Sequence, residues 1–183
     1  MQQNTDFTLK LIELCDMMGT SMQYSSTANL YGNTNDFNED ADLHPESPYA
    51  WSKYLVDRFV KSYSKDFRIN IQGFRYFNVF GNGEDHKGDQ MSPVSKFTKQ
   101  AKANQNIKLF ENSENYKRDF VSVEDVCKVH AKMLDVDKSG IFNVGTGEAT
   151  SFKTIADKVA DKYGVNVDLI PMPKDIAKNY QAY

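Results

Sequence analysis

Apolar side chains recur along the first part of the chain at the spacing of an α-helix. Between residues 6 and 18 they stand three or four positions apart, at Phe7, Leu11, Leu14 and Met18. Gly19 follows them and supplies a helix stop, so we expect a helix over 6–18. A second helix is predicted from Pro48 to about Tyr63, because Ser47 is a good N-cap and proline suits the first helical position.

Strands and helices alternate through the rest of the chain. Short runs rich in β-branched and aromatic residues predict strands over 22–26, 69–80, 107–110, 119–123, 141–144 and 165–170. Amphipathic stretches between them predict helices over 93–103, 124–134 and 151–163. Residues 36–46 and 81–92 are polar, and we expect connecting loops there. This alternation predicts an α/β sheet with crossover connections.

Composition narrows the class of protein. Of the 183 residues, 40% are hydrophobic and 13% aromatic, which argues against a disordered chain. The formal net charge of −3 argues against a dedicated nucleic-acid binder. No signal-peptide h-region opens this sequence and no apolar run approaches the ~20 residues that cross a bilayer, so we expect neither a signal peptide nor a membrane span. Cys15 and Cys127 cannot build a disulfide framework, so we expect a reducing, cytoplasmic location. Together with the net charge and the lack of a long apolar run, this predicts a soluble protein with neither nucleic acid nor membrane as partner.

The most specific local signal is a tyrosine and a lysine four residues apart in the second predicted helix. This spacing places Tyr49 and Lys53 on one helix face, about one turn apart. A phenol is a poor base at neutral pH, and a nearby cation favours its ionised form. The pair is therefore a candidate proton-transfer unit. The alternative, which the pair alone leaves open, is a solvated lysine beside a partly buried tyrosine.

Segments on either side of this pair carry a family resemblance. Tyr49-x-x-x-Lys53 resembles the catalytic pair of the extended short-chain dehydrogenase/reductase family. Residues 24–32, Tyr-Ser-Ser-Thr-Ala-Asn-Leu-Tyr-Gly, resemble its serine-rich segment, with Thr27 in place of the residue that hydrogen-bonds the substrate hydroxyl. Residues 74–81, Phe-Arg-Tyr-Phe-Asn-Val-Phe-Gly, resemble the strand and loop after the catalytic helix. The resemblance implies the later part of a Rossmann-like doubly wound parallel sheet plus a smaller α/β substrate-binding region.

A closer similarity to one branch of that family covers nearly all of residues 4–183. Its most specific part is the run 109–121, Leu-Phe-Glu-Asn-Ser-Glu-Asn-Tyr-Lys-Arg-Asp-Phe-Val. Further matching segments lie at 78–81, 86–88, 140–147, 171–173 and 180–181. Enzymes of this branch invert C6 of an ADP-linked heptose. The resemblance therefore implies a nucleotide-sugar epimerase with ADP-heptose as substrate and NADP as cofactor, and it implies a homo-oligomer.

The resemblance also implies roles for individual residues. Inverting an unactivated carbinol carbon is difficult directly, whereas removing its hydride gives a flat ketone that can be reduced from the other face. Two acid/base groups suit the two orientations of the sugar. By resemblance these are Tyr49, assisted by Lys53, and Lys87, while Thr27 binds the substrate hydroxyl. The implied cofactor-binding residues are Asn4, Tyr49, Lys53, Val79 and Lys87. The implied substrate-binding residues are Asn78, Phe110, Glu111, Asn112, Ser113, Arg118 and Tyr180.

Two of these roles have ordinary alternatives. Lys87 lies in a polar, glycine-rich stretch, where a mobile surface lysine is the simplest interpretation. Arg118 suits a diphosphate because a guanidinium grips phosphate oxygens bidentately, but it could equally form a surface pair with Asp119 or Glu114. The sequence departs from the family at Phe97, where a substrate-contacting histidine is usual.

Residues 141–150 imitate a dinucleotide-binding fingerprint. A predicted strand is followed by Gly145-Thr146-Gly147 and a helix, and Asp168 lies near the distance expected of a ribose-binding acid. The third glycine is replaced by Thr150, which would obstruct close packing of the helix on the strand. We therefore expect an ordinary strand-to-helix connection in the substrate region.

No metal site is expected from the sequence. The three histidines, His44, His86 and His130, do not cluster with the cysteines at the spacing of metal ligands. The sequence also lacks a Gly-x-Ser-x-Gly elbow and a Walker loop.

The resemblance bears on the organisation of the chain. Residues 1–80 are expected to form the remainder of an NADP-binding Rossmann domain with the catalytic helix. Residues 81–183 are expected to form mainly the substrate-binding region, with a strand and a helix returning to the first domain. The glycine-rich turn that holds the cofactor pyrophosphate has no counterpart in this sequence. We therefore expect an internal fragment that by itself binds NADP weakly or not at all and lacks epimerase activity.

Two other interpretations remain open. Another nucleotide-sugar epimerase or a 4,6-dehydratase would share the Tyr49–Lys53 pair. A dehydratase needs an acid/base carboxylate beside Thr27, and Ala28-Asn29 supplies none. A non-catalytic remnant that binds a nucleotide sugar or a partner chain would show saturable binding without turnover.

Overall fold

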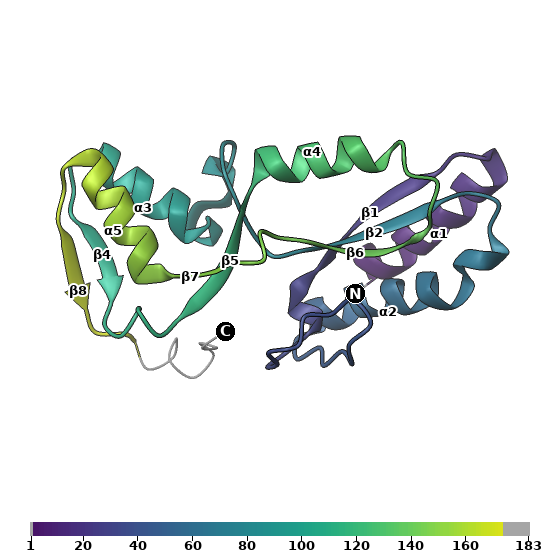
Figure 1. Ribbon diagram of the computed structural model, residues 1–183, viewed down its shortest axis with the longest axis horizontal. Coiled ribbons are helices and arrows are strands. Elements are labelled where there is room, and N and C mark those ends of the chain that lie inside the picture. The colour runs from purple at the N-terminus through teal and green to yellow at the C-terminus, as the bar shows by residue number, and fades with distance from the viewer. Residues whose placement is uncertain (1, 174–183) are drawn as a thin grey trace. The chain divides into compact units, whose positions relative to one another are not determined.

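The computed structural model describes residues 2–173, and these divide into two compact units (Figure 1). Within the described range, the first unit comprises residues 2–77 and 126–144, and the second comprises 78–125 and 145–173. Each unit has its own hydrophobic core and its own strands. None of the helices within residues 2–173 combines the length and the apolar character that a membrane span requires.

The sheet of the first unit contains three parallel strands in the order β1-β2-β6. These are β1 (Met22–Thr27), β2 (Ile71–Tyr76) and β6 (Gly140–Val144). Parallel neighbours cannot be joined by tight hairpins, so helical crossovers connect them. In the register, Tyr24 lies opposite Gly73. A side chain on Gly73 would collide with the Tyr24 ring, because a Cβ there would lie 2.4 Å from its Cζ.

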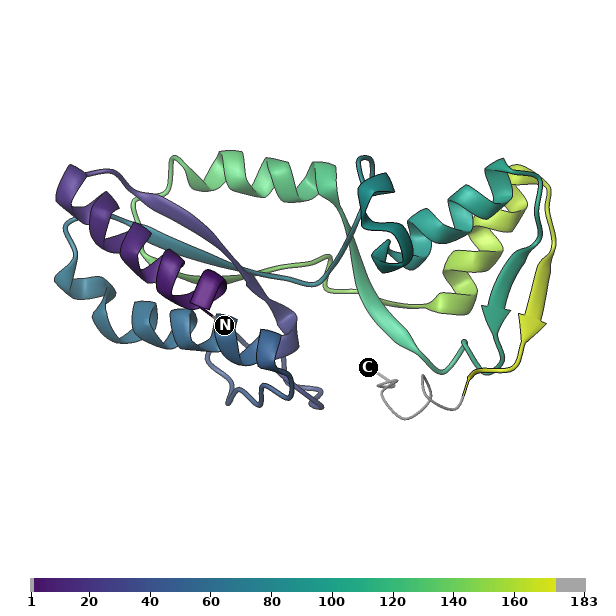
Figure 2. The ribbon, with the colours of Figure 1, turned by 180° about the vertical axis from the view of Figure 1, so that it is seen from behind.

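Helices α1 (Gln2–Met18) and α2 (Pro48–Tyr63) pack together on one face of this sheet (Figures 1 and 2). The Ser47 hydroxyl caps α2 by accepting a hydrogen bond from the Ala50 amide at 3.1 Å, as the sequence predicted. The core beneath the helices contains Ile12, Tyr24, Val56, Val60, Ile69 and Ile71. Full burial of each aliphatic member contributes about 1.5–3 kcal/mol to folding.

Helix α4 (Val123–Met133) covers the opposite face of the sheet (Figure 2). It is held there by His130, whose Nε2 lies 2.5 Å from the Tyr76 hydroxyl. The other ring nitrogen, Nδ1, lies 2.7 Å from Oε1 of Gln23 on β1. Burial lowers the pKa of His130, so the neutral ring is the favoured form.

The second unit contains two small sheets. In one, β3 (Asn78–Phe80) runs parallel to β5 (Lys117–Ser122), which pairs antiparallel with β7 (Ala149–Ser151). In the other, β4 (Ile107–Phe110) pairs parallel with β8 (Val167–Ile170). Helices α3 (Pro93–Lys102) and α5 (Phe152–Tyr163) pack against each other and against β4. Their shared core contains Phe97, Ala101, Ile107, Leu109, Phe120, Phe152, Ala156, Val159 and Ala160.

The α/β fold class predicted from the alternating pattern is confirmed, and three local predictions need correction. The β-rich segment 69–80 forms two strands in different units, because β2 ends at Tyr76 and β3 begins at Asn78. The predicted loop 81–92 contains a 3₁₀ segment, η3 (Asp85–Gln90), with a kink at Gly88. Strand β7 was not predicted, since three residues carry too little pattern and the strand exists only by pairing with β5.

Candidate active site

The carboxyl end of β1 carries the first predicted site residue. Strand β1 ends at Thr27, and the chain turns there into the short helix η1 (Ala28–Leu30). The Thr27 hydroxyl caps this turn by accepting a hydrogen bond from the Asn29 amide at 3.2 Å. Ligands of α/β sheets bind outside the carboxyl ends of the strands. Thr27 therefore occupies the edge of the sheet where a binding site is expected.

The predicted acid/base pair lies on the first two turns of α2. The Tyr49 side chain is 47% exposed, so its phenol is open to a ligand. The Lys53 ammonium donates a hydrogen bond to the Ser25 carbonyl of β1 at 2.9 Å. Burial lowers the pKa of Lys53, and the carboxylate of Asp57, one helical turn further on, partly opposes this shift. Since an ammonium has three donor hydrogens, two remain for a ligand.

Asn4 joins the same unit from the start of α1. Its amide donates a hydrogen bond to the Ser52 hydroxyl at 3.3 Å, beside Lys53 in the sequence. The Thr5 hydroxyl donates to the Ser52 carbonyl at 3.0 Å. These contacts fix the beginning of α1 against the first turns of α2, so Asn4, Lys53 and Thr27 all belong to one packed region.

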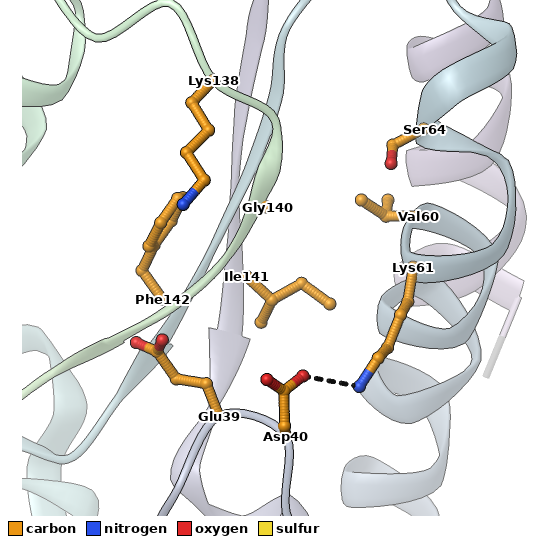
Figure 3. Close-up of a pocket in the computed structure, with 9 residues that line it drawn as sticks. All are labelled: Glu39, Asp40, Val60, Lys61, Ser64, Lys138, Gly140, Ile141 and Phe142. Atoms are coloured by element: carbon orange, nitrogen blue, oxygen red, sulfur yellow. Dashed lines mark hydrogen bonds and ion pairs between the residues drawn. The ribbon is translucent and has the colours of Figure 1, made fainter.

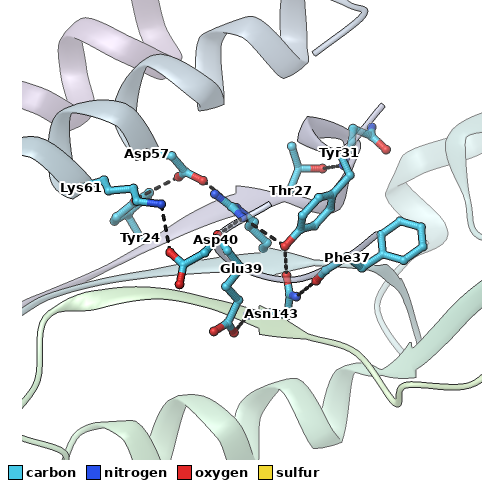
Figure 4. Close-up of polar contacts among 11 residues, drawn as sticks. Tyr24, Thr27, Tyr31, Phe37, Glu39, Asp40, Asp57, Lys61 and Asn143 are labelled. Carbon is cyan, nitrogen blue, oxygen red and sulfur yellow. Dashed lines mark hydrogen bonds and ion pairs between the residues drawn. The ribbon is translucent and has the colours of Figure 1, made fainter. Parts of the chain in front are cut away.

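A buried polar network connects the elements that carry these residues (Figure 4). Nε of Arg75, on β2, lies 2.9 Å from Oδ2 of Asp57 on α2. The Tyr24 hydroxyl, on β1, donates to Oδ1 of the same carboxylate at 2.9 Å. Burial and, after it, the Asp57 carboxylate raise the pKa of Tyr24 well above its ordinary value. Although burial opposes it, hydrogen bonds with Tyr31 and Asp57 raise the pKa of Arg75, so the guanidinium stays charged.

The same network anchors the polar connector 36–46. Arg75 donates to the Glu39 carbonyl at 3.1 Å and to the Tyr31 hydroxyl at 3.0 Å. The Asn143 side chain accepts a hydrogen bond from the Tyr31 hydroxyl at 2.7 Å and donates to the Phe37 carbonyl at 2.6 Å. Sequence reasoning did not identify Arg75 or Asp57. Two signals in the sequence could have identified them. Arg75 is a charged residue within a strand of buried residues, and Asp57 is a carboxylate four residues after Lys53.

A pocket of about 250 Å³ lies between this connector, the second half of α2 and β6 (Figure 3). Its rim carries the exposed ion pair between Lys61 and Asp40, at 3.0 Å. The residues that line it are Glu39, Asp40, Val60, Lys61, Ser64, Lys138, Gly140, Ile141 and Phe142. None of the predicted site residues is among them, so this pocket is separate from the Tyr49–Lys53 region.

The remaining predicted residues within the described range belong to the second unit. Asn78 and Val79 form the first two positions of β3 and are partly buried. Lys87 lies in η3, where its Nζ is 3.5 Å from Oε2 of Glu84. Its side chain is 42% exposed, so the ammonium remains accessible. Tyr180 lies outside the described residues.

The predicted nucleotide-binding residues 110–113 form one turn at the end of β4. Asn112 adopts a left-handed backbone conformation with φ of 62°. The Ser113 hydroxyl donates to the Phe110 carbonyl at 2.5 Å, which closes the turn. Arg118 extends from β5, donating to the Lys117 carbonyl at 2.6 Å and placing its guanidinium 5.9 Å from the centre of the Phe152 ring.

The segment that imitates a dinucleotide fingerprint has another role. The amides of Thr146 and Gly147 each donate to Oδ2 of Asp119 at 2.8 Å. A buried carboxylate of the protein itself thus occupies the donors that a phosphate would need. Thr150 lies in β7, paired with Arg118. The segment connects β6 to α5, and the short strand β7, which was not predicted, precedes the helix.

Other sequence predictions concern metals and Phe97. Within residues 2–173, the acidic, histidine and cysteine side chains form no group of three that could hold a metal ion. Phe97 is 8% exposed and packs in the core of the second unit. Its role there is therefore packing.

Known proteins resemble this chain in sequence and in fold. A model of the NAD dependent epimerase/dehydratase family matches residues 1–145. ADP-L-glycero-D-manno-heptose-6-epimerase of Brachyspira hyodysenteriae (strain ATCC 49526 / WA1) is 38% identical over 189 residues, covering 100% of this chain and 59% of that protein. The chain thus spans about three-fifths of the length of this curated relative.

Two solved structures extend the comparison. The crystal structure of ADP-L-glycero-D-manno-heptose-6-epimerase from Helicobacter pylori matches with a TM-score of 0.85 and 36% identity, over 92% of this chain and 54% of that one. The UDP-glucose 4-epimerase of Thermus thermophilus, in complex with NAD, matches with a TM-score of 0.74 and 26% identity, over 95% of this chain and 63% of that one. The predicted resemblance to nucleotide-sugar epimerases is therefore confirmed. The chain belongs to the NAD dependent epimerase/dehydratase family.

Proposed function

We propose that the protein carrying this chain inverts C6 of ADP-D-glycero-D-manno-heptose to give ADP-L-glycero-D-manno-heptose, with NADP as cofactor. The 38% identity to the Brachyspira enzyme supports this substrate over the UDP-sugars of more distant relatives. The observation that carries the proposal is the placement of Tyr49 and Lys53. Both lie on α2, and the Lys53 ammonium is fixed at the Ser25 carbonyl, two residues before Thr27 on β1.

The residues of the first unit fit a nicotinamide and its ribose. The Lys53 ammonium retains donor hydrogens for ribose hydroxyls, and the Tyr49 phenol is exposed. The chemistry that a nicotinamide supplies when bound is reversible hydride transfer to and from a carbinol carbon. Asn4 in the first unit, and Val79 and Lys87 in the second, complete the proposed cofactor contacts.

Proton transfer is assigned to the side chains of this chain. Tyr49, as phenolate, takes the proton of the substrate hydroxyl while Thr27 hydrogen-bonds the same oxygen. Lys53, one helical turn further along α2, assists this transfer in the proposal. In the other orientation of the sugar, the Lys87 ammonium gives a proton to the ketone oxygen. Tyr49 and Lys87 exchange these roles when the reaction runs in reverse.

The second unit is proposed to hold the nucleotide part of the substrate. In this proposal Phe110, Glu111 and Asn112 of the turn 110–113 line the nucleotide, the buried Ser113 holds the turn in shape, and Arg118 binds the diphosphate. Asn78 and Tyr180 contact the sugar in this proposal. The relatives named above are epimerases of an ADP-linked and a UDP-linked sugar, which supports a nucleoside diphosphate as the common part of the ligand.

A homo-oligomer and a cytoplasmic location belong to the same proposal. Large apolar side chains are exposed on α1 and α2, among them Phe7 at 65% and Trp51 at 46%. Such side chains are commonly covered at an interface between copies. Cys15 and Cys127 are both free thiols, which suits a reducing compartment. Light scattering of the purified protein tests the oligomer directly.

The test replaces Tyr49 by Phe and Lys53 by Met in the protein that carries this chain. Each change is expected to lower kcat by about 10²–10⁴-fold, the usual contribution of acid/base catalysis. Tyr63→Phe on the same helix is the matched control, because Tyr63 is 52% exposed and has no proposed role. Product is followed by NMR of ADP-heptose, with UDP-glucose as competing substrate. Unchanged turnover in Tyr49→Phe, or faster turnover of UDP-glucose, would refute the proposal, and saturable ADP-sugar binding without turnover would favour a non-catalytic remnant.

A further inference from the structure

Loop 81–92 of the second unit contains one buried acid among exposed neighbours. Glu84 is 7% exposed, whereas residues 85–90 are all exposed. Acidic side chains are seldom buried without partners, since an ion loses hydration on leaving water. The position of Glu84 therefore requires compensation from groups around it.

That compensation comes from both ends of the loop. Oε1 of Glu84 accepts hydrogen bonds from the Gly81 amide at 3.1 Å, the Ser92 hydroxyl at 2.8 Å and the Ser95 hydroxyl at 2.7 Å. Oε2 accepts one from the Ser92 amide at 2.8 Å. Although burial by itself raises the pKa of Glu84, these hydrogen bonds lower it to about 2. Glu84 is thus an anion at any working pH, and it closes the loop onto the first turn of α3.

Oε2 has a second neighbour, the Lys87 ammonium, at 3.5 Å. The Lys87 amide also donates to the Glu84 carbonyl at 2.9 Å, so backbone and side chain are both tied to the same residue. The other polar side chains of the loop that can ionise are Asp85, His86 and Asp89, and Nδ1 of His86 lies 2.8 Å from the Gly83 carbonyl oxygen. Within the described residues, Lys87 is the cation paired with Glu84.

We propose that Glu84 is the positioning residue for Lys87: its fixed carboxylate holds the ammonium at one place on a loop that is otherwise exposed. This inference rests on the proposed function, in which Lys87 exchanges a proton with the sugar oxygen. A lysine on a free surface loop populates many rotamers, and only a few of them would place its ammonium at the sugar oxygen. Glu84 removes most of that search, because its own position is set by the four hydrogen bonds to Gly81, Ser92 and Ser95.

Kinetics of Glu84→Gln test the proposal in the protein that carries this chain. The change keeps the size of the side chain and removes its charge. We expect kcat to fall by about 10–100-fold with KM nearly unchanged, as for other misplaced catalytic groups. In a Lys87→Met background the same change is expected to have no further effect on kcat. An equal fall of kcat in both backgrounds would overturn the proposal, because it would show that Glu84 acts through the fold alone.

A second measurement does not depend on epimerase activity. Acylation of lysines by a succinimidyl ester, followed by mass spectrometry, reports how freely each ammonium leaves its partner. Lys87 is expected to react several-fold faster in Glu84→Gln, while Lys96 of the same protein serves as internal reference. Ser95→Ala is the matched control, since it removes one hydrogen bond to Oε1 and leaves the ion pair in place.

The same labelling gives a result even if Glu84→Gln does not fold. Salt weakens exposed ion pairs, so labelling of Lys87 in the unsubstituted protein is expected to rise between low salt and about 1 M salt relative to Lys96. Labelling of Lys87 that responds neither to the substitution nor to salt would overturn the positioning role. It would leave the proposed epimerase function intact, because that function is judged by the Tyr49 and Lys53 variants.

Discussion

Arg75 and Asp57 form an ion pair that is almost completely enclosed, with Nε and Oδ2 2.9 Å apart and side chains 2% and 1% exposed. The pair joins the central strand β2 to α2, one turn beyond Lys53. Tyr24 adds β1 to the same contact through Asp57. The helix with the proposed acid/base pair and the strand that ends at Thr27 are therefore fixed to each other by charge as well as by apolar packing.

Breaking this pair is expected to be strongly destabilising. Asp57→Asn leaves the Arg75 guanidinium buried without its counter-ion, which costs about 3–5 kcal/mol in comparable pairs. Urea denaturation of the purified protein measures the free energy of unfolding. Lys61→Ala, which removes the exposed pair with Asp40, is the control and is expected to leave the denaturation midpoint unchanged. If Asp57→Asn proved as mild as Lys61→Ala, the network would not have the stabilising role assigned to it.

Gly32 is predicted to tolerate no side chain. Its φ is +68°, and an added Cβ would lie 2.3 Å from the His44 carbonyl oxygen. We expect Gly32→Ala to cost about 2–5 kcal/mol, from left-handed backbone strain plus overpacking. Gly164→Ala is matched, since Gly164 has the same φ with nothing within 4 Å, and is expected to cost only the strain, about 1–2 kcal/mol. Equal losses of stability in the two variants would show that the backbone at His44 shifts to accommodate the added methyl group at little cost.

Stability is predicted to fall in mild acid through His130. Because burial lowers the pKa of His130 in the folded state below the ordinary 6.5, the unfolded chain binds the proton more readily. The free energy of unfolding should therefore decrease as the pH falls from above 6.5 through the lower, folded-state pKa. Urea titrations between pH 8 and pH 5 measure this, a range that stays above the titration of Glu84.

His130→Gln provides the comparison for that pH dependence. The variant removes the titrating ring, so this part of the slope is expected to disappear, whatever the stability at neutral pH. His44→Gln is the control, since His44 is exposed, and its slope is expected to match that of the unsubstituted protein. A slope that persists in His130→Gln would assign the acid sensitivity to another group.

Asp119 is predicted to hold the connection between β6 and β7. Its carboxylate accepts from the Thr146 amide and hydroxyl and from the Gly147 amide. Asp119→Asn puts an amide donor opposite these donors, at a cost of about 1–3 kcal/mol for the unsatisfied groups. Hydrogen exchange of residues 145–148 is expected to accelerate, whereas Asp157→Asn on the surface of α5 should leave it unchanged. Protected amides in Asp119→Asn would mean that the connection is held by its backbone alone.

Local sequence determined most of the secondary structure of this protein. Residues near in the chain set helix ends, as with the Ser47 cap and Pro48, and hydrophobic spacing set which stretches became helices and strands. The order of these elements was enough for the α/β class. The spacing of Tyr49 and Lys53 likewise followed from one helical turn, and their match to a family motif led to the candidate site.

Tertiary structure alone decided the contacts that no local pattern encodes. Arg75 pairs with Asp57 because the fold brings β2 and α2 together. In the same way, Glu84 accepts hydrogen bonds from Ser92 and Ser95, and Asp119 accepts one from Thr146. Each of these carboxylates is buried, and a buried charge is stable only where donors converge on it from several elements. Sequence shows that such residues are present but not which donors surround them. Short features such as β7 were missed for the same reason, since a three-residue strand is stabilised by its partner rather than by its own residues.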